Sequence, residues 1–248
     1  MEVTRRGAAS WARLAAPERA NACGPGEIER LLEWLAAAPA EEGVRALVLT
    51  GTGRAFCAGA DVAAGAEVAG DPEALVAYVR LGRELADALA AAPVPTIAAV
   101  NGVALAGGLE LVLACDLAVA SSAARLGDAH APYGIVPGWG SSARLPRLVG
   151  ARAATRLLLT GLEVSADEAH RLGLVNEVVE PDALEAAVDA LVEQIAAVGP
   201  STSARLLALA RQSLALSLAD ALEAEWAALR DHVADPELRA GVARFLDA

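Results

Sequence analysis

Apolar residues along the first half of the chain follow two different periods. Short and nearly continuous apolar runs predict buried strands at residues 44–50, 94–100 and 117–121. Between these runs, apolar residues spaced three and four apart predict amphipathic helices at residues 27–38 and 73–92. Strands that alternate with helices in this way predict an α/β fold.

The ends of the chain carry further elements. Residues 1–16 predict a pair of short strands. Ser165 and Glu168 form a capping-box pattern, which predicts a helix that Gly173 ends, and a last short strand is expected at 174–179.

The remainder of the sequence has helical periodicity only. We expect helices at residues 182–198, 202–217, 219–232 and 236–246. We therefore divide the chain into a core at 1–180 and a C-terminal helical region at 181–248, which packs on the core or on a neighbouring subunit.

One stretch carries the clearest chemical signal. The predicted strand at 94–100 leads through an Asn-Gly turn to the pair Gly107 and Gly108, and then to a short apolar helix that contains Glu110. The first N–H groups of a helix have no intrahelical partner and lie at the positive end of the helix dipole. Because glycine lets a substrate carbonyl approach closely, this stretch can hold a developing oxyanion. Glu110 either complements the helix N-terminus or acts as an acid or base with a shifted pKa.

Composition limits the possible partners. The 248 residues are 55% hydrophobic and 21% charged, which indicates a folded protein with a sizeable core. The net charge is −12 and all 20 basic residues are arginine, so the chain has neither a basic stripe for nucleic acid nor the lysine of a Walker A loop. We see neither a membrane span nor a secretory signal in the sequence. We expect a cytoplasmic protein with no nucleic-acid or membrane partner.

Cysteine and histidine usage argues against metal chemistry. Cys23, Cys57 and Cys115 lie among apolar or glycine residues, which predicts free thiols in a reducing compartment. These cysteines and the three histidines lack ligand spacing, so we predict no metal site. His170 and His232 are expected on the surface. The chain also lacks the G-x-S-x-G pattern of a serine hydrolase.

Five segments match the motifs of one family, in that family's order: Arg19–Ala22, Ala55–Asp61, Ile97–Asp116, Gly134–Gly140 and Leu159–Val175. Over nearly its whole length the chain resembles the crotonase superfamily, the enoyl-CoA hydratase/isomerase family. The resemblance implies a spiral of ββα units with a C-terminal helical oligomerisation region, assembled as a homotrimer or a dimer of trimers. It also implies an acyl-CoA thioester substrate, with coenzyme A as part of the substrate and no permanently bound cofactor.

The resemblance further implies the catalytic positions. The backbone N–H groups of Ala58 and Gly107 would form an oxyanion hole for the thioester oxygen and stabilise an enolate. Glu110 matches the first of two family glutamates, whereas the position of the second is occupied by His130. A histidine can hold or deliver a proton near neutral pH, so these two side chains can form an acid/base pair. The alternative for His130 is a purely structural role.

Several supporting positions follow from the same resemblance. Asp128 either orients His130 or takes over part of its role, and Tyr133 either donates a hydrogen bond or packs in the core. Trp139 either narrows the pocket or packs in the core. Substrate-binding positions are Ala60, Asp61, Gly108, Pro137 and Gly138. We do not find the basic tail with which the family helps to hold CoA, and we expect Arg19 and Arg54 as its nearest candidate substitutes, unless these are solvated surface residues.

Three functions remain open on the sequence. We expect an enzyme, an enoyl-CoA hydratase (a lyase) that converts a 2-enoyl-CoA to a 3-hydroxyacyl-CoA, as in fatty acid metabolism. The histidine at position 130 keeps open an isomerase, a decarboxylase or a thioester hydrolase on the same scaffold. A non-catalytic homologue that binds acyl-CoA or assists a partner enzyme is the third possibility.

Overall fold

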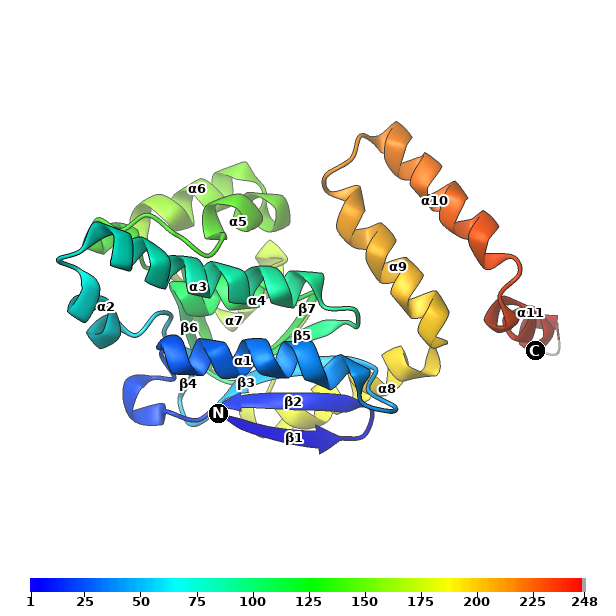
Figure 1. Ribbon diagram of the computed structural model, residues 1–248, viewed down its shortest axis with the longest axis horizontal. Helices are drawn as coiled ribbons and strands as arrows, with labels where there is room; N and C mark the ends of the chain where they lie inside the picture. Colours follow the sequence, from blue (N-terminus) through cyan, green and yellow to red (C-terminus); the bar gives the residue numbers. More distant parts are fainter. Residues whose placement is uncertain (247–248) are drawn as a thin grey trace. The chain divides into compact units, whose positions relative to one another are not determined.

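The computed structural model describes residues 1–246, in two compact units that divide the chain between Val192 and Glu193 (Figure 1). The division falls inside helix α8 (Leu184–Ala197), later in the chain than the boundary at residue 180 that the sequence suggests. Within the described part of the chain, no helix combines the length and the apolar character that crossing a membrane needs.

A six-stranded sheet forms the centre of the first unit. Its strands lie in the order β1 (Glu2–Arg6), β2 (Ala9–Leu14), β3 (Ala46–Gly51), β5 (Thr96–Val100), β7 (Leu117–Ser121) and β10 (Glu177–Val179). β1 and β2 form an antiparallel hairpin, and all other neighbours are parallel. Every residue of β3 and β5 is buried, which explains their continuous apolar runs. The predicted strands are thus confirmed, although the last one is shorter than expected.

A second, four-stranded sheet has the order β4 (Ala55–Cys57), β6 (Val103–Leu105), β8 (Arg125–Gly127) and β9 (Glu163–Ser165). β4, β6 and β8 are parallel neighbours, and β9 is antiparallel to β8. The sequence predicts none of these strands, because three residues are too few to show a period. The sequence predicts that β5 leads through a turn directly into the next helix. This prediction is wrong, because β6 lies between them.

In three successive pairs of strands, the first strand belongs to the six-stranded sheet and the second to the four-stranded sheet. The pairs β3–β4, β5–β6 and β7–β8 each give one strand to the first sheet and one to the second. The helices that follow them are α2 (Val62–Val68) with α3 (Pro72–Ala91), α4 (Gly107–Ala114), and α5 (Ser141–Val149). This repetition confirms the α/β fold of ββα units.

The helices of the first unit cover the buried strands with apolar faces. α1 (Pro25–Ala37) buries Ile28, Leu31, Trp34 and Leu35, and it packs beside α3 (Figure 1). α6 (Ala151–Thr160) packs against α5. Helix α7 (Ala166–Leu172) has the predicted cap, in which the Ser165 hydroxyl accepts a hydrogen bond from the backbone N–H of Glu168, and it ends at Gly173.

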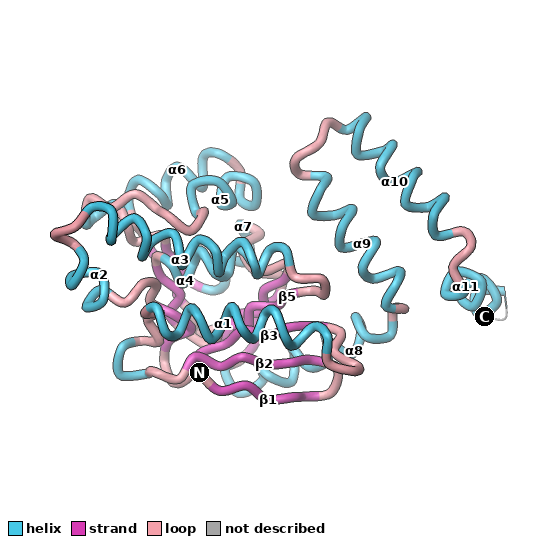
Figure 2. The backbone as a smooth tube through the Cα atoms, in the orientation of Figure 1, coloured by secondary structure: helices cyan, strands magenta, loops and turns pink. Residues whose placement is uncertain are grey.

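The second unit contains helices only in its described residues (Figure 2). These are the end of α8, α9 (Pro200–Ser213), α10 (Leu218–His232) and α11 (Pro236–Leu246), which confirms the predicted helices. The Glu237 carboxylate accepts hydrogen bonds from the backbone N–H groups of Ser201 and Thr202, which ties α11 to the start of α9. The surface position expected for His232 is wrong. Its side chain is buried, with Nε2 3.2 Å from Thr202 Oγ1.

Candidate active site

Three loops converge at one edge of the second sheet. Residues 58–61 follow β4, residues 106–107 follow β6, and residues 128–130 follow β8. Because β4, β6 and β8 are parallel neighbours, their carboxyl ends lie at the same edge, and so do the loops that leave them. The residues just before Gly107 and His130, Ala106 and Ala129, have φ values of 49° and 53°. Non-glycine residues with positive φ are strained, and such strain concentrates at functional sites.

The first predicted oxyanion donor needs correction. The backbone N–H of Ala58 donates to Ala20 O at 3.0 Å, so it is already engaged within the protein. Two residues later, Ala60 forms an isolated parallel β-bridge with Cys23. In this bridge the Cys23 N–H donates to Gly59 O, and Cys23 O accepts from the Asp61 N–H. This pattern leaves the N–H of Ala60 without a partner among the described residues. Among residues 58–61, Ala60 is therefore the residue whose N–H is free in the described structure.

The second predicted donor, Gly107, lies at the start of α4. Gly107 is the first residue of α4, and its N–H has no acceptor in the described chain. The loop that carries Ala60 lies against it, because a Cβ added to Gly59 would be only 2.7 Å from Gly107 N. The backbone N–H groups of Ala60 and Gly107 thus belong to segments in direct contact.

Glu110 is fully buried one turn further along α4. Its Oε1 accepts hydrogen bonds from the backbone N–H groups of Trp139 at 2.8 Å and Ser141 at 2.9 Å. Its other oxygen, Oε2, lies 3.8 Å from His130 Nε2. Since its N–H donors come from a distant loop, Glu110 is more than a complement to its own helix N-terminus.

His130 is backed by a second buried carboxylate. Its Nδ1 lies 3.1 Å from Asp128 Oδ1, and Asp128 Oδ2 accepts a hydrogen bond from the Ser141 hydroxyl. Asp128 is completely buried, and the His130 side chain is 12% exposed. Ser141 therefore hydrogen-bonds to both buried carboxylates. Its N–H donates to Glu110, and its hydroxyl donates to Asp128. Sequence reasoning missed this role of Ser141, which no local motif signals.

Burial and charge shift the pKa values of these groups in opposite ways. Burial raises the pKa of Glu110, although its two N–H donors and the charge of His130 act against the rise. Burial alone would lower the pKa of His130, but the contact with Asp128 and the charges of Asp128 and Glu110 outweigh it, so the pKa is raised. The pKa of Asp128 is lowered, because His130 and Ser141 outweigh the effect of its burial. His130 is thus favoured as the cation beside a buried base.

Three other predicted site residues have clear structural roles. Asp61 caps α2 by accepting from the Ala63 N–H at 2.9 Å, and it forms an ion pair with Arg19. A Cβ at Gly108 would lie 1.8 Å from Cys57 O, and one at Gly138 would lie 2.3 Å from Val79 Cγ1. Glycine at 108 and 138 is therefore required by close packing, and a role of these residues or of the half-buried Pro137 in substrate binding stays a prediction.

Tyr133 does not pack in the core, because it is 79% exposed. Its expected role as a hydrogen-bond donor stays a prediction. Arg19 is engaged by Asp61, and Arg54 is exposed. His170 is exposed as expected.

The cysteines form no disulfide. Cys23, Cys57 and Cys115 are free, as predicted. Among residues 1–246, no group of histidine, cysteine or acidic side chains has the arrangement of a metal site.

Trp139 packs in the core rather than lining open space. Its indole is buried between α3 and α4, where a Cβ at Gly82 would lie 1.9 Å from Cε2 and one at Gly107 2.6 Å from Cζ3. We predict that Gly82→Ala destabilises the fold by about 1–3 kcal/mol through overpacking. Thermal unfolding tests this, and a variant with an unchanged Tm would contradict the placement of the indole.

Comparison with known proteins places the chain in a family. Residues 7–248 match the enoyl-CoA hydratase/isomerase family. A crotonyl-CoA hydratase of Syntrophomonas wolfei is 34% identical over 93% of this chain and 88% of that protein. An enoyl-CoA hydratase of Bacillus anthracis superposes with a TM-score of 0.94 at 33% identity, covering 99% of this chain and 95% of that one. For an enoyl-CoA hydratase of Polaromonas sp. JS666 the TM-score is 0.95 at 30% identity, covering 99% and 96%. The chain belongs to the enoyl-CoA hydratase/isomerase family, which is the crotonase superfamily.

Proposed function

We propose that this protein is an enoyl-CoA hydratase that adds water across the C2=C3 bond of a 2-enoyl-CoA. The observation that carries the proposal is the placement of Glu110 Oε2 3.8 Å from His130 Nε2. At this separation one water molecule can hydrogen-bond to both atoms. A buried base and a cationic histidine around one water are the groups that hydration needs.

The thioester oxygen accepts hydrogen bonds from the backbone N–H groups of Ala60 and Gly107. As the C2=C3 electron pair moves toward the carbonyl, negative charge develops on this oxygen. The N–H of Gly107 lies at the positive end of α4, so it stabilises that charge without reorganisation. The product of this step is an enolate held against two fixed donors.

Glu110 and His130 divide the proton transfers. The Glu110 carboxylate takes a proton from water as the water oxygen forms its bond to C3. His130 Nε2 gives its proton to C2, and the enolate collapses to the thioester. The proton on Glu110 then passes to His130, which restores the starting charges. Water is consumed and no other reactant is needed.

Asp128 and Ser141 hold His130 in position for this work. Asp128 faces Nδ1, which leaves Nε2 directed to Glu110, and its charge supports the imidazolium. Ser141 fixes Asp128 through its hydroxyl. We also propose the family's assembly as a homotrimer or dimer of trimers, a cytoplasmic location and no permanently bound cofactor.

The pH profile of kcat tests the division of roles. Glu110 must be ionised, so activity rises with pH through an apparent pKa above its ordinary value of 4.5. His130 must be protonated, so activity falls through an apparent pKa above 6.5. His130→Gln is expected to lower kcat by about 10²-fold and to remove the alkaline fall. An alkaline fall that persists in this variant would contradict the role of His130.

Product analysis separates hydration from the other reactions of this scaffold. The same pair could also move a proton between C2 and C4, which is isomerisation. Incubation with matched 2-enoyl and 3-enoyl thioesters, followed by mass spectrometry, should show the gain of one water on the 2-enoyl substrate. Conversion of the 3-enoyl thioester to the 2-enoyl form without gain of water would favour the isomerase. Release of free CoA would favour the hydrolase.

A further inference from the structure

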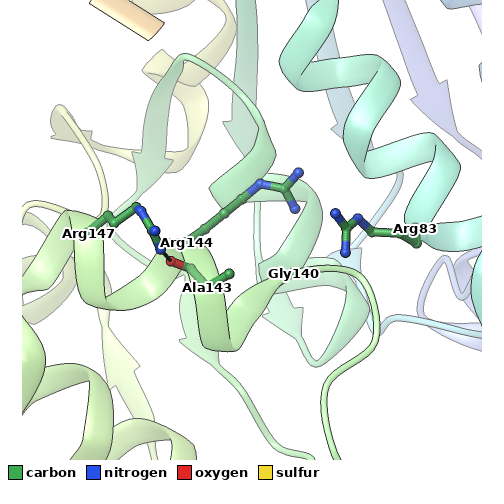
Figure 3. Close-up of a pocket in the computed structure, with 5 residues that line it drawn as sticks. All are labelled: Arg83, Gly140, Ala143, Arg144 and Arg147. Atoms are coloured by element: carbon green, nitrogen blue, oxygen red, sulfur yellow. Dashed lines mark hydrogen bonds between the residues drawn. The ribbon is translucent and has the colours of Figure 1, made fainter. Parts of the chain in front are cut away.

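Arg144 reaches back from α5 to the loop that holds Glu110. Its Nη1 donates to Trp139 O at 2.6 Å, and its Nη2 donates to Asp87 Oδ1 on α3 at 2.8 Å. The other oxygen of Asp87 accepts from Arg83 Nε at 2.7 Å, which fixes the carboxylate from its own helix. Figure 3 shows the guanidinium groups of Arg83 and Arg144 directed toward one another.

The local backbone makes room for this contact. Gly140 has a φ of +121°, and a Cβ added there would lie 2.1 Å from Arg144 Nη1. The guanidinium therefore occupies the space that any side chain at position 140 would take. Glycine at this position serves both the left-handed backbone and the passage of the arginine.

The turn that Arg144 holds is the turn that holds Glu110. Trp139 presents its carbonyl to Arg144 and its N–H to Glu110 Oε1, and the Ser141 N–H reaches the same oxygen. We propose that Arg144 is a positioning residue, which keeps the 139–141 turn in the conformation that directs both N–H groups at Glu110. Its catalytic consequence rests on the proposed function, whereas its effect on Glu110 itself does not.

Loss of the Arg144 contact should change the pKa of Glu110 in one direction, upward. The charged groups that face Glu110 are His130 and Asp128, both from the segment after β8. On α3, the Asp87 carboxylate accepts hydrogen bonds from both Arg83 and Arg144, and Arg144 itself contacts the turn. The two N–H donors stabilise the Glu110 carboxylate and lower its pKa against burial. A turn released from Arg144 loses these bonds, so the pKa of Glu110 rises further.

A neighbouring arginine provides a matched control. Arg83, Gly140, Ala143, Arg144 and Arg147 line a pocket of about 200 Å³ beside the turn (Figure 3). Arg147 lies on the same helix and carries the same charge. In the described structure it donates to Ala143 O of its own helix and has no ion pair. Arg147→Met therefore removes an equal charge from the same pocket without touching the turn.

The test combines a direct titration with kinetics. ¹³C-carboxyl NMR of the free protein, with the Glu110 signal assigned through Glu110→Gln, reports the pKa whatever reaction the protein catalyses. Arg144→Met should raise that pKa, shift the acid limb of the kcat profile upward and lower kcat about tenfold, because small misplacements of reacting groups cost up to about 10²-fold. KM should change less than about twofold. Arg147→Met should leave all of these values unchanged.

The outcomes are distinguishable from those of a purely structural arginine. Should Arg144→Met fail to fold, Asp87→Asn loosens the same guanidinium and should shift the Glu110 pKa in the same direction by a smaller amount. A folded Arg144→Met with a lower Tm but an unshifted Glu110 titration would overturn the proposal. A shifted titration in a protein that does not hydrate 2-enoyl-CoA would support the positioning role and contradict the proposed function.

Discussion

Glu110→Gln is expected to lower kcat/KM for 2-enoyl-CoA hydration by about 10³-fold, the middle of the range for loss of a general base. Glutamine keeps the size of the side chain and can still accept the N–H groups of Trp139 and Ser141 at Oε1. It cannot take a proton from water. The loss should therefore fall on the chemical step, with the Tm close to that of the parent protein.

Steady-state hydration kinetics of the purified variant measure this effect. Glu163→Gln on β9 is a suitable control, because its side chain is 43% exposed and pairs with Arg125 outside the site. That control should keep full activity. Full activity of Glu110→Gln would mean that the base lies elsewhere, and the assignment of the site would then be wrong.

Gly59→Ala is expected to lower kcat/KM by about 10²–10³-fold, the loss caused by removing one oxyanion donor in other enzymes. Backbone donors cannot be deleted by changing their own side chains. A methyl group at Gly59, however, would lie 2.7 Å from Gly107 N, where the proposed hydration places the thioester oxygen. The φ of +101° at this residue also disfavours alanine, so some loss of stability accompanies the loss of activity.

A second glycine variant controls for the stability effect. Gly65 lies in α2, has ordinary helical backbone, and has only the Tyr78 ring within contact distance of an added Cβ, at 3.5 Å. Gly65→Ala should leave hydration unchanged, because alanine is the better helix former. Comparing kcat/KM at a temperature where both variants are folded isolates the effect at the oxyanion hole. Equal activity of the two variants would contradict the placement of this hole.

Elements long enough to show a period could be predicted from the sequence, whereas the strands of the second sheet could not. The strands β3, β5 and β7 and the helices α1 and α3 are long enough to show their period. The second sheet consists of three-residue strands, which carry no periodic signal. That sheet brings the three site loops together, so the sequence alone does not reveal why these loops meet.

Contacts that form only on folding also decide which site residues could be predicted from the sequence. Gly107, Glu110 and His130 were predicted by position and lie together in the structure. Ala58 is wrong as a donor, because its N–H is taken by Ala20, a contact that only the folded turn creates. The β4–β6 pairing also contains a register irregularity between Ala55 and Cys57, which counting along a sequence cannot detect. Ser141 was missed because Asp128 meets it only in the folded protein.

The most direct test of the account is whether this protein hydrates 2-enoyl-CoA. We would follow the ultraviolet absorbance of the conjugated enoyl thioester on adding the purified protein to short and medium 2-enoyl-CoAs, and identify the product. The account predicts loss of the band with formation of 3-hydroxyacyl-CoA. A stable band, with acyl-CoA still bound, would contradict hydration at the Glu110–His130 pair.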